Sequence, residues 1–144
     1  MGLMITPRIP GWESRLTALF ECWRNEPFRW GINDCVSFTC LGIKASTARD
    51  PIEEMRGRYA GEKGAQVFLA RYGTGFIEQI KTLFADYPTI SISRMQRGDF
   101  ALMQHPRGVS VGLYNSGALW APGETGLEAV PLTYGLKGWG VGHE

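Results

Sequence analysis

The 144-residue chain has few of the side chains that most enzyme and metal sites use, with only three cysteines and two histidines. Cys22, Cys35 and Cys40 form no even disulfide framework, and their spacings match no paired Cys-x-x-Cys zinc signature. We therefore expect reduced thiols in a protein that folds in a cytosol, with no cofactor and no metal site of its own. For Cys22 and Cys40 we expect ordinary, mostly buried thiols.

The sequence also lacks long apolar runs and any strong excess of charge. No apolar run approaches the length of a membrane span, and the first residues show no apolar segment typical of a signal peptide. Fifteen basic and fourteen acidic side chains give a net charge of +1 without a basic patch, which argues against a nucleic-acid partner. Because no repeat, linker or low-complexity tract divides the chain, we expect one domain over residues 1–144.

The first half of the chain has the apolar spacing of helices. Trp12, Leu16 and Trp23 lie on one face of a helix that starts at Gly11 and ends before Pro27. Asp50-Pro51 predicts the start of a short helix, since aspartate caps helices and proline favours their first position. Further helices are predicted over residues 34–48, 62–72 and 76–84.

At about Thr89 the apolar spacing changes to the alternation of strands. Strands are predicted over residues 99–103, 109–114, 118–121, 127–130 and 139–141, with a turn over 105–108 and a tight hairpin turn at Asn115-Ser116-Gly117. Helices followed by a meandering antiparallel sheet predict an α+β fold.

One stretch, residues 28–38, leads through aromatic residues and a glycine to Cys35 at the predicted start of a helix. Asn33 or Asp34 is the expected cap of this helix. The positive end of the helix dipole is expected to lower the pKa of Cys35 and to favour its nucleophilic thiolate form. A cysteine nucleophile also needs a base that accepts its proton.

Several motifs, taken in order, resemble the NlpC/P60 superfamily of papain-like cysteine peptidases and amidases, which cut peptides of bacterial cell walls. Asp34-Cys35-Val36-Ser37-Phe38 is similar to the start of that superfamily's nucleophile helix, and Arg97-Gly98-Asp99-Phe100 to the entry of its first strand. Ser110-Val111-Gly112-Leu113-Tyr114 and Ala118-Leu119-Trp120-Ala121 are similar to its next two strands. Trp-Gly-x-x-Asp-Cys, Arg-Gly-Arg-Tyr and Ala-Pro-Gly resemble a phage-encoded branch found in prophages and tail gene clusters. The likeness covers about residues 11–141.

This resemblance implies N-terminal helices packed on a C-terminal antiparallel sheet or partial barrel, with Cys35 at the nucleophile position. The superfamily's histidine base and the histidine that orients it correspond to Ser110 and Trp120 here. Serine does not accept a proton at neutral pH, and the tryptophan ring only donates hydrogen bonds. The resemblance therefore leaves both partner positions of Cys35 empty.

Two histidines are the remaining candidates for a base. His105 is predicted to be a solvated turn residue, more than ten Å from the Ser110 position on the basis of strand rise. His143 is the second residue from the C-terminus, where chains fray. We expect neither to replace the missing base.

These departures favour a catalytically degenerate protein with a structural or adaptor role in a phage tail or baseplate. Such a protein is made in the host cytoplasm, becomes part of the virion and binds tail or baseplate hub proteins. The alternative is an active cysteine peptidase or amidase that cleaves peptidoglycan peptides during phage entry. A third hypothesis, ranked last because no ligand set is present, gives Cys35 to a metal–sulfur centre shared with a partner.

Overall fold

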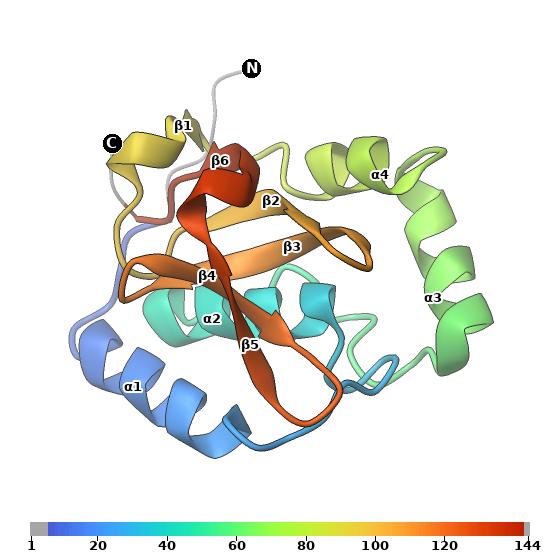
Figure 1. The fold of residues 1–144 in the computed structure, drawn as a ribbon, viewed down its shortest axis with the longest axis horizontal. Coiled ribbons are helices and arrows are strands. Elements are labelled where there is room, and N and C mark those ends of the chain that lie inside the picture. Colours follow the sequence, from blue (N-terminus) through green and yellow to red (C-terminus); the bar gives the residue numbers. More distant parts are fainter. Residues whose placement is uncertain (1–5, 143–144) are drawn as a thin grey trace.

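The computed structural model describes residues 6–142, and over this range it contains four α-helices and one six-stranded antiparallel sheet (Figure 1). The helices are α1 (Trp12–Trp23), α2 (Cys35–Thr47), α3 (Gly61–Leu69) and α4 (Phe76–Leu83). The strands are β1 (Thr89–Ile90), β2 (Phe100–His105), β3 (Gly108–Asn115), β4 (Ala118–Pro122), β5 (Leu127–Pro131) and β6 (Gly135–Trp139). The α+β fold class predicted from the sequence is confirmed.

The segment after Asp50 differs from its prediction, because residues 51–57 form successive turns and no helix. The Asp50 carboxylate accepts the Ile52 N–H at 3.0 Å. It also accepts two hydrogen bonds from the Arg56 guanidinium, from Nε at 2.6 Å and from Nη2 at 3.1 Å. Gly57 then takes a positive φ of 75° that ends the turns. The Asp50 side chain does cap the backbone as predicted. However, its contacts with Arg56 and the positive φ of Gly57 favour turns, so no helix forms.

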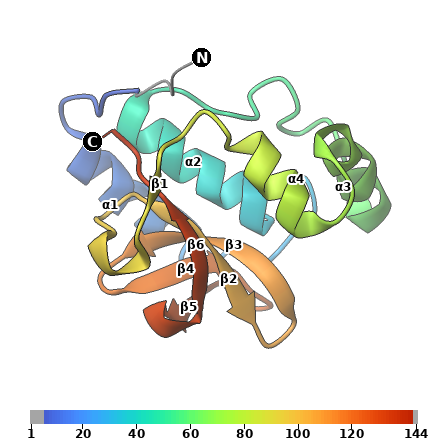
Figure 2. The same ribbon diagram turned by 90° about the horizontal axis from the view of Figure 1, so that it is seen from above.

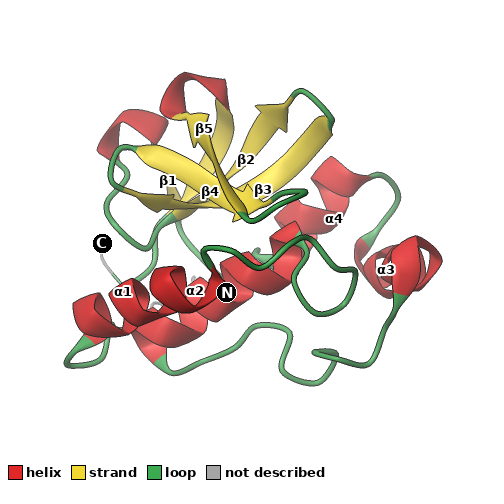
Figure 3. Ribbon diagram, turned by 60° about the horizontal axis from the view of Figure 1, so that its bottom comes forward, coloured by secondary structure: helices red, strands yellow, loops and turns green. Residues whose placement is uncertain are grey.

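The strand order is β1-β6-β2-β3-β4-β5, so four consecutive strands form a meander and β6 returns to lie between β1 and β2. β1 and β5 are the two edges of the sheet in the described part of the chain, so the sheet is open. Figures 2 and 3 show the four α-helices on one side of the sheet, with α2 central among them.

Close contact between α2 and β3 depends on Gly42. A Cβ at this position would lie 2.4 Å from Cδ2 of Leu113, which is completely buried. The absence of a side chain therefore allows the helix backbone to approach the strand. This contact fixes the start of α2, and with it Cys35, relative to the sheet.

The two faces of the sheet belong to different apolar clusters. Phe100, Leu102 and Val111 pack in the main core together with α2 and α4. Ala101, Met103 and Leu119 belong to a second cluster on the opposite face. Cys35 packs against both clusters, so it lies at the junction between α2 and the two faces of the sheet.

The Gly98-Asp99 motif has a structural explanation at the start of β2. Asp99 is completely buried and accepts the backbone N–H groups of Gln96 at 2.7 Å and Val141 at 2.9 Å. Arg8 lies 3.5 Å from the same carboxylate. Asp99 thus ties both ends of the described chain to the sheet.

Candidate functional site

The helix that carries Cys35 begins with Asp34 as its cap. Asp34 Oδ1 accepts the Ser37 N–H at 2.7 Å, and Oδ2 accepts the Gly31 N–H at 2.9 Å. The phenol of Tyr59 donates a third hydrogen bond to Oδ2 at 2.6 Å. Of the two residues considered as caps from the sequence, the structure selects Asp34. Its carboxylate satisfies the backbone of the preceding loop as well as that of the helix.

Two further residues hold the same loop. Gly31 has a φ of 82°, and a Cβ on it would lie 1.9 Å from the Tyr59 carbonyl oxygen, so only glycine fits. Arg56 donates to the Ser37 carbonyl at 3.2 Å while its other contacts bind Asp50. The Trp-Gly-x-x-Asp-Cys and Arg-Gly-Arg-Tyr motifs are therefore parts of one interlocked support for the start of α2.

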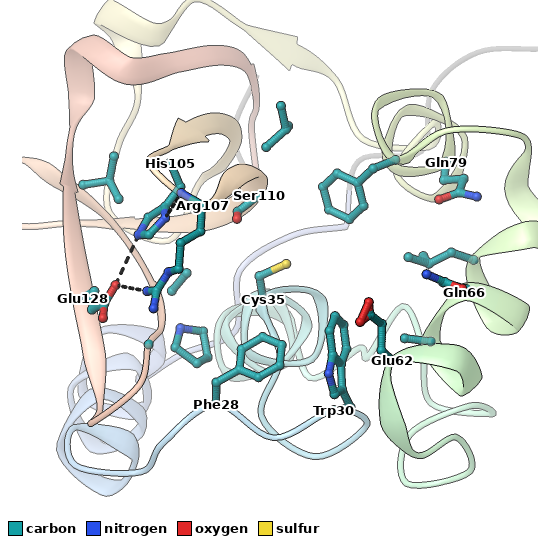
Figure 4. A pocket seen from close by; sticks show the side chains of 18 of the residues that line it. Phe28, Trp30, Cys35, Glu62, Gln66, Gln79, His105, Arg107, Ser110 and Glu128 are labelled. Atoms are coloured by element: carbon teal, nitrogen blue, oxygen red, sulfur yellow. Dashed lines mark hydrogen bonds and ion pairs between the residues drawn. The ribbon is translucent and has the colours of Figure 1, made fainter.

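Cys35 is the first residue of α2 and lines a cavity of about 850 Å³ (Figure 4). Burial raises the pKa of its thiol to about 12, and the Asp34 charge adds to this rise. Hydrogen bonds from backbone N–H groups, first that of Val111 in β3, act in the opposite direction and are outweighed. The expectation that the helix dipole would lower this pKa is wrong, because loss of hydration dominates at this position.

The first part of β3 has no β4 partner, and its Val109 and Ser110 line the cavity together with Cys35. β3 pairs with β4 only over Leu113–Asn115, although β3 begins at Gly108. The chain before α2 is tied to the residue that follows β4, since the Phe28 N–H donates to the Gly123 carbonyl at 2.8 Å. Residues 28–35 thus form one wall of the cavity.

Of the two partner positions implied by the resemblance, only one reaches the cavity. Ser110 lines it together with Cys35. Trp120 pairs with Leu113 across the strands and packs in a third cluster beneath α1, with its ring 5.9 Å from that of Phe20. Its indole N–H donates to the Asn115 carbonyl at 2.8 Å. Trp120 therefore serves the core and does not lie beside Cys35.

The placement of His105 corrects the sequence prediction. His105 is the last residue of β2, its side chain is only 15% exposed, and it lines the cavity. Ser110 pairs with Met103, two residues before His105, so the two Cα atoms are separated by roughly 8 Å. The predicted separation of more than ten Å between His105 and Ser110 is wrong, because the two strands of the hairpin lie side by side. His143 lies outside the described residues.

Both ring nitrogens of His105 have partners. Nδ1 accepts the backbone N–H of Arg107 at 3.1 Å, so the ring proton of the neutral side chain is on Nε2. Nε2 then donates to Glu128 Oε1 at 3.2 Å, and Arg107 donates to the same oxygen at 2.6 Å. Burial alone would raise the pKa of Glu128, but these two hydrogen bonds and the Arg107 charge lower it. In this arrangement His105 has no free nitrogen to accept a proton from Cys35.

Glu128 reaches this position because Gly123 leaves room for it. A Cβ on Gly123 would lie 2.0 Å from the Glu128 carboxylate. We refer to His105, Arg107 and Glu128 as the polar cluster of the cavity. Nothing in the sequence pattern linked these residues, because the β2–β3 hairpin supplies His105 and Arg107 and β5 supplies Glu128; the tertiary fold brings them together.

The remaining walls come from α3, α4 and the sheet. Apolar side chains form most of the surface: Phe28, Trp30, Ala65, Leu69, Phe76, Val109, Ala121, Pro122 and Val130. Glu62 and Gln66 of α3 and Gln79 of α4 lie across the cavity from the polar cluster (Figure 4). The sequence gives no functional signal for these three residues, because their helices carry no motif.

The fold and site define a small α+β protein with a protonated cysteine in an aromatic-walled cavity. Residues 7–141 match the family described as a domain of unknown function, DUF6950, and the chain belongs to that family. A comparison with curated proteins finds no match. Within residues 6–142, no helix has the length and apolar character needed to cross a membrane. Over the same range, no three histidine, cysteine or acidic side chains are grouped as metal ligands would be.

Proposed function

We propose that this protein is a non-catalytic member of the papain-like NlpC/P60 fold and acts as a structural or adaptor component of a phage tail or baseplate. It is made in the host cytoplasm, is incorporated into the virion and binds tail or baseplate hub proteins. The phage setting rests on the resemblance of the motifs, in order, to a phage-encoded branch of that superfamily. The non-catalytic role rests on the chemistry of the cavity.

The observation that carries the proposal is the environment of Cys35. Burial raises the pKa of the Cys35 thiol to about 12, so the thiol is protonated at pH 7. The cavity residue at the base position is Ser110, and the cavity histidine uses both ring nitrogens in other hydrogen bonds. A thiol in this state is neither ionised in advance nor placed beside a group that removes its proton.

The structural work of the shared motifs supports the same conclusion. Asp34 and Tyr59 stabilise the start of α2, and Asp99 ties the chain ends to the sheet. These contacts give the motif residues structural roles that do not depend on catalysis. The fold then offers a cavity that can hold a segment of a partner.

Two experiments test the proposal. Purified peptidoglycan is incubated with the protein and with Cys35→Ala, and released peptides are measured by liquid chromatography and mass spectrometry. We expect no release above buffer with either protein; release that the substitution abolishes would overturn the non-catalytic role. Co-expression with tail and baseplate hub proteins is expected to yield a stable complex, and a persistently solitary monomer would count against the adaptor role.

One observation favours a second candidate, an active peptidase or amidase acting on peptidoglycan peptides. His105 and Glu128 form a histidine–carboxylate pair on the wall of the cavity that Cys35 lines. A carboxylate commonly orients a histidine base in such enzymes. In this candidate the His105 ring must release the Arg107 N–H and turn toward Cys35. Its signature is peptidoglycan cleavage that is lost in both Cys35→Ala and His105→Gln.

A further inference from the structure

We propose that the cavity beside Cys35 binds a segment of a partner protein by placing a lysine side chain between Glu62 and Trp30. This inference rests on the proposed adaptor function, since it names the chemistry of the partner that such an adaptor would hold. It concerns the side of the cavity opposite the polar cluster.

The charges of the cavity favour a cationic group. Its lining includes the carboxylates of Glu62, Glu124 and Glu128 and the guanidinium of Arg107. Arg107 and Glu128 are joined at 2.6 Å and largely cancel each other. Glu62 and Glu124 are left, so the cavity is negative although the whole chain carries a net charge of +1. A cleft of one sign attracts ligands of the opposite sign.

The aromatic wall of the cavity indicates where a cationic group would bind. The Phe28 and Trp30 rings pack edge to face with centroids 4.7 Å apart, and Trp30 keeps 40% of its surface exposed. Gly31 contacts the Tyr59 carbonyl, which brings the start of α3, and thus Glu62, close to Trp30. Figure 4 shows Trp30 and Glu62 at the same end of the cavity. An aromatic face beside a carboxylate is a favourable site for an ammonium group.

The surrounding groups suit lysine in particular. Glu62 and Gln66 are exposed, one helical turn apart on α3, and both line the cavity; among the described residues no side-chain hydrogen bond or ion pair involves the Glu62 carboxylate. A compact ammonium has three donors for such acceptors. Leu69 and Phe76 offer apolar contact for the methylene stem.

The size of the cavity calls for more than one side chain. A volume of about 850 Å³ lies near the upper end of the range for sites that enclose a drug-sized ligand. Residues flanking the lysine would occupy the apolar middle, where Cys35 and Val109 lie. At the far end, the N–H groups of Arg107 that Glu128 does not use can donate to a carbonyl of the bound segment.

The test uses two acetylated and amidated pentapeptides, one with lysine and one with norleucine at the centre of four alanines, titrated into the full chain by calorimetry. We expect saturable binding of the lysine peptide at least about tenfold tighter than that of the norleucine peptide. Glu62→Gln should remove this difference, and Trp30→Leu should reduce it. Glu21→Gln is the control, because Glu21 is an exposed glutamate on α1 that does not line the cavity, and it should leave both affinities unchanged.

Equal affinities for the two peptides, no saturable binding, or an equal effect of Glu21→Gln and Glu62→Gln would overturn the lysine site. Tighter binding of a soluble cell-wall stem peptide than of the lysine peptide would overturn the assignment to a partner protein. Mass spectrometry of the peptide after titration separates this inference from the proposed function. Cleavage of the peptide would refute the non-catalytic role, whereas equal affinity without cleavage would refute only the lysine site.

Discussion

Tyr59 donates a 2.6 Å hydrogen bond to Asp34, the residue that caps the helix beginning at Cys35. The two side chains are 25 positions apart in the sequence, and both residues are buried. Burial, followed by the Asp34 charge, raises the pKa of the Tyr59 phenol, so the phenol stays protonated and continues to donate. This bond joins the turns before α3 to the loop before α2 and fixes one end of the cavity.

Tyr59→Phe removes that hydrogen bond and leaves the Asp34 carboxylate with one donor fewer in a buried position. We expect a loss of about 1.5–3 kcal/mol in the free energy of unfolding, the usual range for a hydrogen bond to a charged group. Urea denaturation followed by circular dichroism measures it. Tyr134→Phe is the matched control, since Tyr134 is 53% exposed. A Tyr59→Phe protein as stable as this control would show that the bond contributes little.

Gly42→Ala tests the contact between α2 and β3. In an open helix this change normally stabilises by about 1 kcal/mol. Here the new Cβ would lie 2.4 Å from the buried Leu113 side chain, and we expect a loss of about 1–3 kcal/mol instead. Gly64→Ala in α3 is the control, because its nearest neighbour would be 3.6 Å away, and it should be neutral or stabilising. Stabilisation by both substitutions would mean that α2 does not pack closely on β3.

The pKa of Cys35 also predicts a change of stability with pH. In the unfolded chain its thiol ionises near pH 9.0, whereas in the folded protein it ionises only near pH 12. Above pH 9 the unfolded state therefore binds fewer protons than the folded state, and stability falls as the pH rises. This one group should contribute a slope on the order of 1 kcal/mol per pH unit. The contribution is fully present below pH 9 and is lost toward pH 12.

Cys35→Ser should remove that part of the slope, since a serine hydroxyl does not ionise in this range. Urea denaturation of both proteins at pH 8 and at pH 10 measures the difference. Cys22→Ser, at an exposed cysteine, should keep the slope of the unmodified protein. An unchanged slope in Cys35→Ser would mean that the thiol ionises equally in both states.

His105 is expected to be in the tautomer that carries its proton on Nε2. The Arg107 N–H donates to Nδ1, and Glu128 accepts from Nε2. Long-range ¹⁵N–¹H correlation spectra at pH 8 distinguish the two tautomers directly. Glu128→Gln should increase the share of the other form. A proton mainly on Nδ1 in the unmodified protein would free Nε2 as an acceptor and would favour the second, catalytic candidate.

The sequence predicted best what neighbouring residues determine. Asp34 caps α2 through an N–H three residues away, and the strands of the meander are joined by short turns, so both were visible as local patterns. The position of β6 between β1 and β2 could not be predicted, because no local pattern in the sequence specifies which strands pair across the sheet. The turns after Asp50 were not predicted, because the Asp50 carboxylate binds Arg56 as well as the Ile52 N–H, and Gly57 with its positive φ ends the turns.

The site was predicted only in part for the same reason. The motif placed Cys35 at the start of a helix, but its pKa depends on burial among residues distant in the sequence, and the backbone N–H that most opposes the rise belongs to Val111 in β3. The order of the motifs placed Trp120 at the position of the orienting histidine. In the structure its strand pairing directs the side chain toward the third apolar cluster instead. The polar cluster arises from the β2–β3 hairpin and β5, and Glu62 comes from a helix with no motif. Tertiary contacts therefore decide the chemistry of the cavity.

The central claim, that Cys35 is an unactivated thiol, is tested most directly by the rate of its alkylation as a function of pH. Cys22→Ser removes the exposed cysteine, and Cys40 is completely buried, so iodoacetamide uptake at Cys35 can be followed by mass spectrometry. We predict a rate that rises continuously from pH 6 to above pH 9, with no plateau, as a thiol of raised pKa requires. A plateau reached at or below pH 7 would show a stabilised thiolate and would contradict the account.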